Sequence, residues 1–175
     1  MISGIPGDPL AVFDIQVPTN QRSAELDGWE LAVQHMFGES GFGVSANYTI
    51  VNSDLEYDNF DRNNQFALVG LSDSANFVAF FEKSKWSVRA AYNWRDEFLA
   101  STADGAGPNP VYVEPYGQID VNASYDVTEN FTLAVEAINL TDEIQRLHGR
   151  NPHQALFVTQ SGARYMIGAR YRFGQ

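Results

Sequence analysis

Hydrophobic and polar residues alternate along the last part of the chain, over residues 157–173. Every second residue from Phe157 onward is mostly apolar, with an aromatic end, whereas the residues between them include three arginines and two glycines. A period of two predicts a β-strand, because successive side chains point to opposite faces of a sheet. The pattern is about three times as long as a usual strand of about 5–6 residues. A strand this long, with one apolar and one polar face, is typical of a transmembrane β-barrel.

The same alternation recurs earlier in the chain and predicts about eight antiparallel strands, an all-β fold. The facing of the segment around residues 75–82 is ambiguous, because its apolar residues fall on both sides. Residues 66–71 are predicted to be either a short strand or a loop that packs on another element. The predicted strands cover residues 10–17, 29–37, 42–50, 75–82, 86–95, 117–125, 131–138 and 157–173.

The connections between these segments are alternately short and long. Turns near residues 38–41, 83–85 and 127–130 are short, whereas residues 52–74, 100–113 and 141–155 form long connections. Up-and-down barrels of the outer membrane have short periplasmic turns and long outer loops. We therefore expect the last strand to begin outside the cell and Phe173 to lie at the periplasmic rim.

Composition narrows the function classes. The net charge is -11, from 22 acidic and 11 basic residues, which argues against nucleic-acid binding. Aromatic residues make up 13% of the chain, as aromatic girdles at membrane interfaces would require. There is no cysteine, so thiolate catalysis and thiolate metal sites are excluded. No catalytic arrangement stands out, and we predict neither an enzyme nor a cofactor.

Several blocks of sequence, in this order, resemble the C-terminal end of a TonB-dependent outer-membrane receptor. The resemblance covers roughly residues 20–173 and is greatest to the subgroup associated with oligosaccharide scavenging. The blocks lie at residues 28–31, 89–99, 116–125, 136–142 and 161–173.

The resemblance implies that residues 1–175 are the C-terminal section of a larger barrel of about 22 strands. It also implies a plug domain, further strands and a TonB-binding box outside this chain, which fits an N-terminus without a visible secretory signal. The implied function is TonB-energised uptake of a scarce solute, such as an oligosaccharide or a siderophore-type chelate. The implied location is the outer membrane of a Gram-negative bacterium.

The resemblance further implies four kinds of partner: outer-membrane lipid, the plug with the rest of the barrel, the TonB complex and the barrel-assembly machinery. TonB would act only through the N-terminal part of the receptor. The assembly machinery would read the terminal aromatic residues Tyr171 and Phe173, although Gly174 and Gln175 follow them.

Two other functions fit the same alternation. The chain could be a self-contained eight-stranded outer-membrane barrel with a structural or adhesive role, since eight strands close around a filled interior. It could also be a soluble β-barrel binding module whose apolar face points inward. Alternation alone does not distinguish the inside from the outside of a barrel.

Candidate ligand contacts lie in the long connections, because loops on a rigid scaffold carry recognition. Residues 57–62 combine aromatic rings, which stack on sugars, with groups that bind hydroxyls. The simpler interpretation of this segment is an acidic, solvated loop. His148 and His153 fit no compact metal-ligand motif, and no metal is predicted. The candidates are Tyr57, Asp58, Asn59, Asp61, Arg62, Arg146, His148 and Arg150.

A set of arginines falls on the polar faces of the predicted strands. These guanidinium groups could line a path for an anionic or hydroxyl-rich solute. They could equally pair with acidic residues of neighbouring strands or of the plug. The set comprises Arg89, Arg95, Arg164, Arg170 and Arg172.

Overall fold

The computed structural model describes residues 23–174, and its elements of regular structure are antiparallel β-strands. The described residues contain eleven strands, whereas the sequence predicted about eight in the whole chain. None of the described residues forms a helix that is long and apolar enough to cross a membrane. The predicted strand at residues 10–17 lies outside the described residues. The strands are β1 (Leu26–Met36), β2 (Phe42–Ser53), β3 (Ser74–Lys83), β4 (Trp86–Arg95), β5 (Phe98–Ser101), β6 (Val111–Val113), β7 (Tyr116–Thr128), β8 (Phe131–Ile138), β9 (Gln145–His148), β10 (Ala155–Thr159) and β11 (Arg164–Tyr171).

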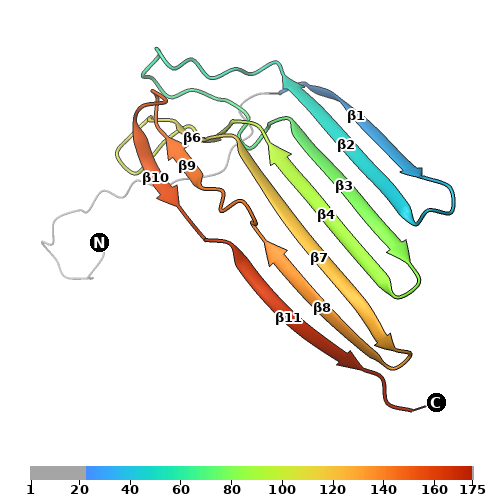
Figure 1. The fold of residues 1–175 in the computed structure, drawn as a ribbon. Helices are drawn as coiled ribbons and strands as arrows, with labels where there is room; N and C mark the ends of the chain where they lie inside the picture. The colour runs from blue at the N-terminus through green and yellow to red at the C-terminus, as the bar shows by residue number, and fades with distance from the viewer. Residues whose placement is uncertain (1–22, 175) are drawn as a thin grey trace, which may run out of the picture.

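Seven strands form the main sheet, in the order β1-β2-β3-β4-β7-β8-β11 (Figure 1). The three tight hairpins lie at one end of this sheet, and the long connections lie at the other end. The four remaining strands form a small sheet at the long-connection end, in the order β10-β9-β6-β5. Within the described residues β1 and β11 are the two edges of the main sheet, so this part of the chain is an open, curved wall.

The prediction of one strand over residues 157–173 is wrong. The pattern divides into β10, which pairs with β9 in the small sheet, and β11, which pairs with β8 in the main sheet. Gly162, between the two strands, has a φ of 75°, a left-handed conformation that interrupts a strand and favours glycine. The alternation continues through this break because short polar and small residues occupy it, so periodicity alone did not show it.

Three strands were not predicted. These are β5, β6 and β9, which contain 4, 3 and 4 residues. Segments this short cannot display a period of two above chance. Residues 66–71 form a loop rather than a strand, and the Gly70 N–H donates to the Leu99 carbonyl over 2.8 Å. Of the two predicted alternatives, the packed loop is therefore correct.

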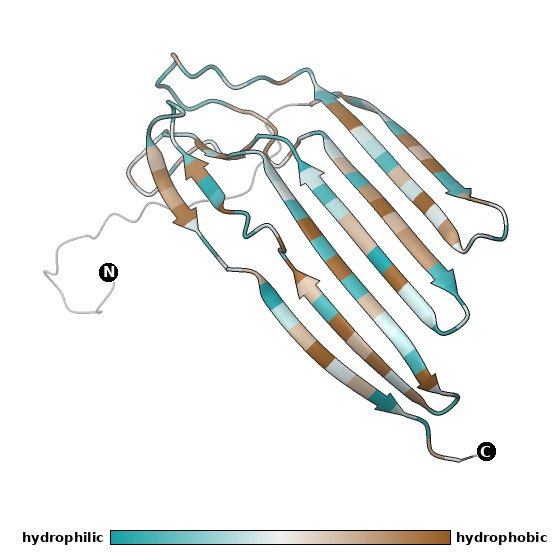
Figure 2. Ribbon diagram, viewed as in Figure 1, coloured by the Kyte–Doolittle hydropathy of each residue, from teal (hydrophilic) through white to brown (hydrophobic). Residues whose placement is uncertain are grey.

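The strand register places the apolar sides of all seven strands on one face of the main sheet. Figure 2 shows the resulting alternation of hydrophobic and hydrophilic residues along the strands. The register also decides which face each residue of β3 takes. Phe77 pairs with Tyr92 on the apolar face, whereas Phe80 pairs with Arg89 on the polar face. One row of paired residues crosses the whole apolar face: His35, Val44, Ala79, Ala90, Val121, Ala137 and Tyr165.

Aromatic side chains gather near both ends of this apolar face. At the short-hairpin end Trp86 contacts Tyr125, with ring centroids 4.6 Å apart. Near the long-connection end Tyr48 and Trp94 stack at 6.4 Å. Two bands of aromatic residues that flank an apolar zone are the arrangement expected at the two interfaces of a bilayer.

The apolar face is not covered by other described residues. Ile167 and Tyr165 are 86% and 68% exposed. The buried apolar side chains of the described residues are Val78, Leu99 and Val113, of which Leu99 and Val113 belong to the small sheet. An apolar surface that extends over seven strands requires a partner, and the hydrocarbon core of a membrane provides one.

Candidate functional site: the loop cluster on the small sheet

The small sheet carries the long connections beyond the end of the main sheet. Two of its strands are joined to main-sheet strands by only two residues each. Asp96 and Glu97 connect β4 to β5, and Glu114 and Pro115 connect β6 to β7. We use the term loop cluster for residues 54–73, 102–110 and 149–154, the three connections gathered at this end (Figure 1).

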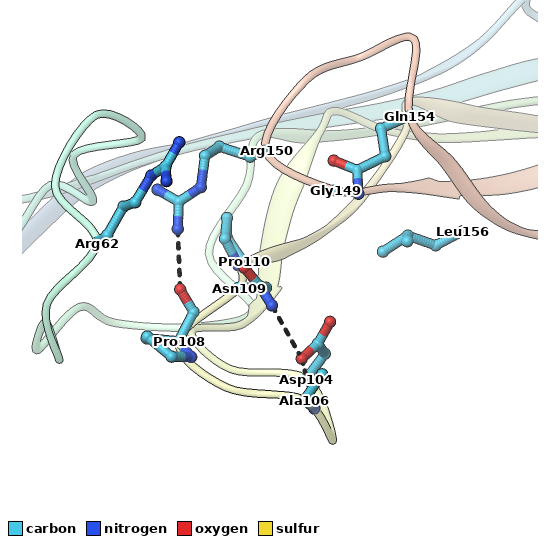
Figure 3. A pocket seen from close by; sticks show the side chains of 10 residues that line it. All are labelled: Arg62, Asp104, Ala106, Pro108, Asn109, Pro110, Gly149, Arg150, Gln154 and Leu156. Carbon is cyan, nitrogen blue, oxygen red and sulfur yellow. Dashed lines mark hydrogen bonds between the residues drawn. The ribbon is translucent and has the colours of Figure 1, made fainter.

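Arg150 ties the three segments of the loop cluster together. Its Nη1 donates to the carbonyl oxygens of Asn59 and Asp61, and its Nη2 donates to the carbonyl oxygen of Pro108 over 2.8 Å (Figure 3). Three of the predicted residues, Asn59, Asp61 and Arg150, are therefore brought together. Because all three acceptors are main-chain oxygens, no pattern of side chains could have predicted the contact.

The segment at residues 57–65 is folded by its own side chains. The Gln65 amide accepts from the Asp58 N–H and donates to the Asp58 and Asp61 carbonyl oxygens, all within 2.9 Å. The Asp58 carboxylate in turn accepts from the Phe60 N–H. These bonds hold Phe60 at the tip of the loop, where it is 96% exposed. The exposed aromatic ring of this segment is thus that of Phe60, whereas the Tyr57 hydroxyl is buried with no partner among the described residues.

His148 lies beneath the loop cluster and is 2% exposed. Its ring stacks on Tyr112, with centroids 5.2 Å apart. Nδ1 lies 2.7 Å from the Gly149 carbonyl oxygen and Nε2 lies 3.0 Å from Glu97 Oε2. A carbonyl oxygen only accepts, so Nδ1 is the donor in the contact with Gly149, while Nε2 faces the Glu97 carboxylate. His148 therefore supports the loops and has no ring nitrogen free for a solute.

Tyr112 connects this buried pair to the loop above it. Burial raises the pKa of the Tyr112 phenol above its ordinary value, and its hydroxyl donates to Asn59 Oδ1 over 3.1 Å. The phenol thus stays protonated at neutral pH. His148, Tyr112 and Asn59 form a continuous column from the small sheet to the loop that carries Phe60.

Three cavities open in the loop cluster, and two of them adjoin, with Arg62, Arg150 and Gln154 lining both. The first, of about 390 Å³, also contains Asp104 and Asn109 (Figure 3). There the Ala106 N–H and the Asn109 amide hold the pKa of the Asp104 carboxyl below its ordinary value. The second cavity, of about 520 Å³, extends to Asn59, Phe60 and Asn151. The third, of about 430 Å³, is lined by residues of the segment 54–66 and is acidic, with Asp54, Glu56 and Asp61. Phe60 belongs to the predicted segment 57–62 but was not among the individual candidates, and sequence reasoning did not select Asp104, Asn109, Asn151 or Gln154.

Arg146 and the polar-face arginines lie elsewhere. Arg146 is an exposed residue of β9 and lines neither cavity. Arg95 donates to Ser72 Oγ over 2.8 Å and to the Gly70 carbonyl, so it anchors a loop. Over residues 23–174 the single close contact between a basic and an acidic side chain is that of His148 with Glu97. That range contains no group of three or more His, Asp or Glu residues that could hold a metal ion.

A family model described as "TonB dependent receptor-like, beta-barrel" matches residues 2–140. The chain therefore belongs to the TonB-dependent receptor β-barrel family, and the resemblance found in its sequence is confirmed at this level. Neither the curated proteins nor the solved structures yield a match. The family consists of outer-membrane receptors and transporters, so the antiparallel wall described above is a barrel portion of such a receptor.

Proposed function

We propose that this chain forms part of the wall and the outer loops of a receptor for energised uptake of a scarce solute, such as an oligosaccharide or a siderophore-type chelate. The observation that carries the proposal is the continuous apolar face of the seven-stranded sheet, opposite a polar face. In this arrangement the apolar face contacts lipid and the polar face borders the lumen. The loop cluster faces the medium, and the short hairpins face the periplasm.

We also propose that residues 1–175 are the C-terminal section of a barrel of about 22 strands. The outer edges of β1 and β11, which pair with no other strand over residues 23–174, support this, because a strand edge in a membrane needs a partner for its backbone groups. Further strands would pair with these edges, and a plug would meet the polar-face arginines Arg89, Arg164 and Arg170. TonB would act through the N-terminal part of the receptor.

The C-terminal aromatic residues support a proposed contact with the barrel-assembly machinery. Tyr171 and Phe173 lie beside each other at the short-hairpin end, with ring centroids 4.8 Å apart, and Phe173 is 89% exposed. Removal of the Phe173 ring would slow insertion without changing the loop cluster. Pulse-labelling of Phe173→Ser in cells would show this as a longer-lived unfolded precursor.

Tryptophan fluorescence in brominated-lipid vesicles tests the orientation of the wall. All three tryptophans, Trp29, Trp86 and Trp94, lie on the apolar face, so the bromine atoms should quench the emission of each. A matched probe on the polar face, Asn122→Trp in a background without the native tryptophans, should not be quenched. Equal emission in brominated and ordinary lipid for the native protein would contradict the proposal.

Uptake by cells tests the function itself. Deletion of the gene that encodes this chain should abolish accumulation of the receptor's solute at limiting concentration, and a protonophore should have the same effect on the wild type. Labelled oligosaccharides and ferric chelates are the solutes to compare. Solute flux through liposomes that contain this chain alone would overturn the proposal that it acts as a section of a larger, gated barrel.

A further inference from the structure

The cavity of about 520 Å³ in the loop cluster has a positively charged lining, unlike the acidic chain as a whole. Two arginines line it, together with three amide side chains, a phenylalanine and a proline, but no carboxylate. The chain as a whole carries a net charge of -11. The cavity is therefore a positive site on an acidic protein, and the residues that matter are Arg62, Arg150, Asn59, Asn151, Gln154 and Phe60.

The two guanidinium groups lack counter-ions. Arg150 is bonded only to carbonyl oxygens, which leaves its Nε–H and one Nη2 N–H without a partner among residues 23–174. Arg62 makes no hydrogen bond or ion pair within the same range and projects toward Arg150 (Figure 3). Two like charges that line one cavity repel each other, and an oxyanion between them would remove the repulsion. Guanidinium groups bind carboxylates with paired hydrogen bonds.

The remaining lining residues indicate the chemistry of the rest of the ligand. Phe60 is almost fully exposed at the edge of the cavity, where its ring offers a flat apolar surface to the C–H face of a sugar. Amide side chains both donate to and accept from hydroxyl groups. The same two arginines also line the adjoining cavity, where the charged Asp104 accepts hydroxyl hydrogens. The positive charge is thus uncompensated in the cavity at Phe60 and partly balanced in the cavity at Asp104.

We propose that the loop cluster binds an acidic saccharide, with the carboxylate of a uronic acid between Arg62 and Arg150. Its ring lies on Phe60, and hydroxyl groups of the next sugar extend toward Asp104. This inference rests on the proposed function as a solute receptor and specifies the chemistry of that solute. The neighbouring cavity at residues 54–66 is lined by Asp54, Glu56 and Asp61, and these carboxylates disfavour such a ligand there.

Binding to outer membranes from cells that produce the protein tests the inference. The probes are trigalacturonate and the neutral trisaccharide galactotriose, measured by titration calorimetry. The wild type should bind trigalacturonate and should bind galactotriose at least about 10-fold more weakly, since a lost charge-assisted pair is worth about 1.5–3 kcal/mol. Arg62→Gln should weaken trigalacturonate binding by about 10-fold or more, and Phe60→Ser should weaken it by about 5-fold.

Lys85→Gln is the matched control. It removes the same charge at the opposite end of the sheet, where Lys85 reaches the Val127 carbonyl, and trigalacturonate binding should be unchanged. Equal affinity of Arg62→Gln and wild type for trigalacturonate would overturn the inference, and so would tighter binding of galactotriose. Binding of inorganic phosphate with the same dependence on Arg62 and none on Phe60 would overturn the saccharide assignment. Energised uptake of a neutral sugar, unaffected by Arg62→Gln, would leave the proposed function standing while the acidic-saccharide inference fails.

Discussion

The main sheet and the small sheet of this barrel section are stabilised in different ways. In the main sheet, long strands pair in almost unbroken register, and the register alone sorts apolar from polar side chains. In the small sheet the strands are short, and the register shifts within both the β5–β6 and the β9–β10 pairs. Buried polar side chains, chiefly His148 and Asn139, hold its connections in place.

This difference separates the scaffold from the site. A regular ladder tolerates many apolar residues on its lipid side, because lipid does not demand complementary packing. The loop cluster instead depends on single hydrogen bonds from Arg150, Gln65 and His148, each with specific acceptors. Single substitutions should therefore loosen the loops locally, whereas the main sheet should respond chiefly to charge on its apolar face.

The largest effect is expected at Asn139, where the chain leaves β8 for the small sheet. Asn139 is 1% exposed, has a φ of 54°, and bonds through its side chain to both the N–H and the carbonyl of Glu143. Asn139→Leu would leave both Glu143 groups unpaired and strain the backbone, at a cost of about 4 kcal/mol. Hydrogen exchange should show faster opening at β9 and β10, with β2 and β3 unchanged.

Asn63→Leu is the control for this experiment, since Asn63 is an exposed loop residue that bonds only to Asp61. Asn63→Leu should change the free energy of local opening at β9 and β10 by less than about 0.5 kcal/mol. Equal loosening of β2 and β3 by Asn139→Leu would show that the two sheets unfold together, which would contradict the comparison.

A charge on the apolar face should produce the next largest effect. Val121 lies in the paired row that crosses this face, and Val121→Arg should lower the free energy of unfolding in vesicles by about 3 kcal/mol. The neighbouring Asn122 points to the polar face, so Asn122→Arg should change the free energy of unfolding little. Denaturant titrations followed by tryptophan fluorescence measure both, and equal losses would refute the assignment of the two faces.

The smallest effect is expected at the joint between the two sheets. An alanine at Gly162 would meet no other atom but would have to adopt the φ of 75°, at a cost of about 1 kcal/mol. Gly168 on β11 also has free space, and its φ is not positive, so Gly168→Ala should be neutral or slightly stabilising. The same titrations would rank the two variants, and the reverse order would show that the break at residues 160–163 is not a strained turn.

The candidate site was only partly predictable from the sequence. The pairing of aromatic and polar residues at 57–62 directed attention to the correct loop, and Arg62 and Arg150 proved to share two cavities. The burial of His148 was not predictable, because it depends on Glu97 and Tyr112, which are distant in sequence. The exposure of Phe60 was not predictable either, because it depends on bonds from Gln65 to main-chain groups.

Alternation along the chain was sufficient to predict most strands of the main sheet and their short hairpins, because the period of two is a local property of each strand. The family was recognised from the ordered blocks of sequence that resemble it. Tertiary structure decided where the pattern at residues 157–173 divides, which face Phe80 takes, and which loops meet at Arg150. These features arise from pairing between distant segments and from bonds to main-chain oxygens, which every residue possesses and which residue identity therefore does not reveal.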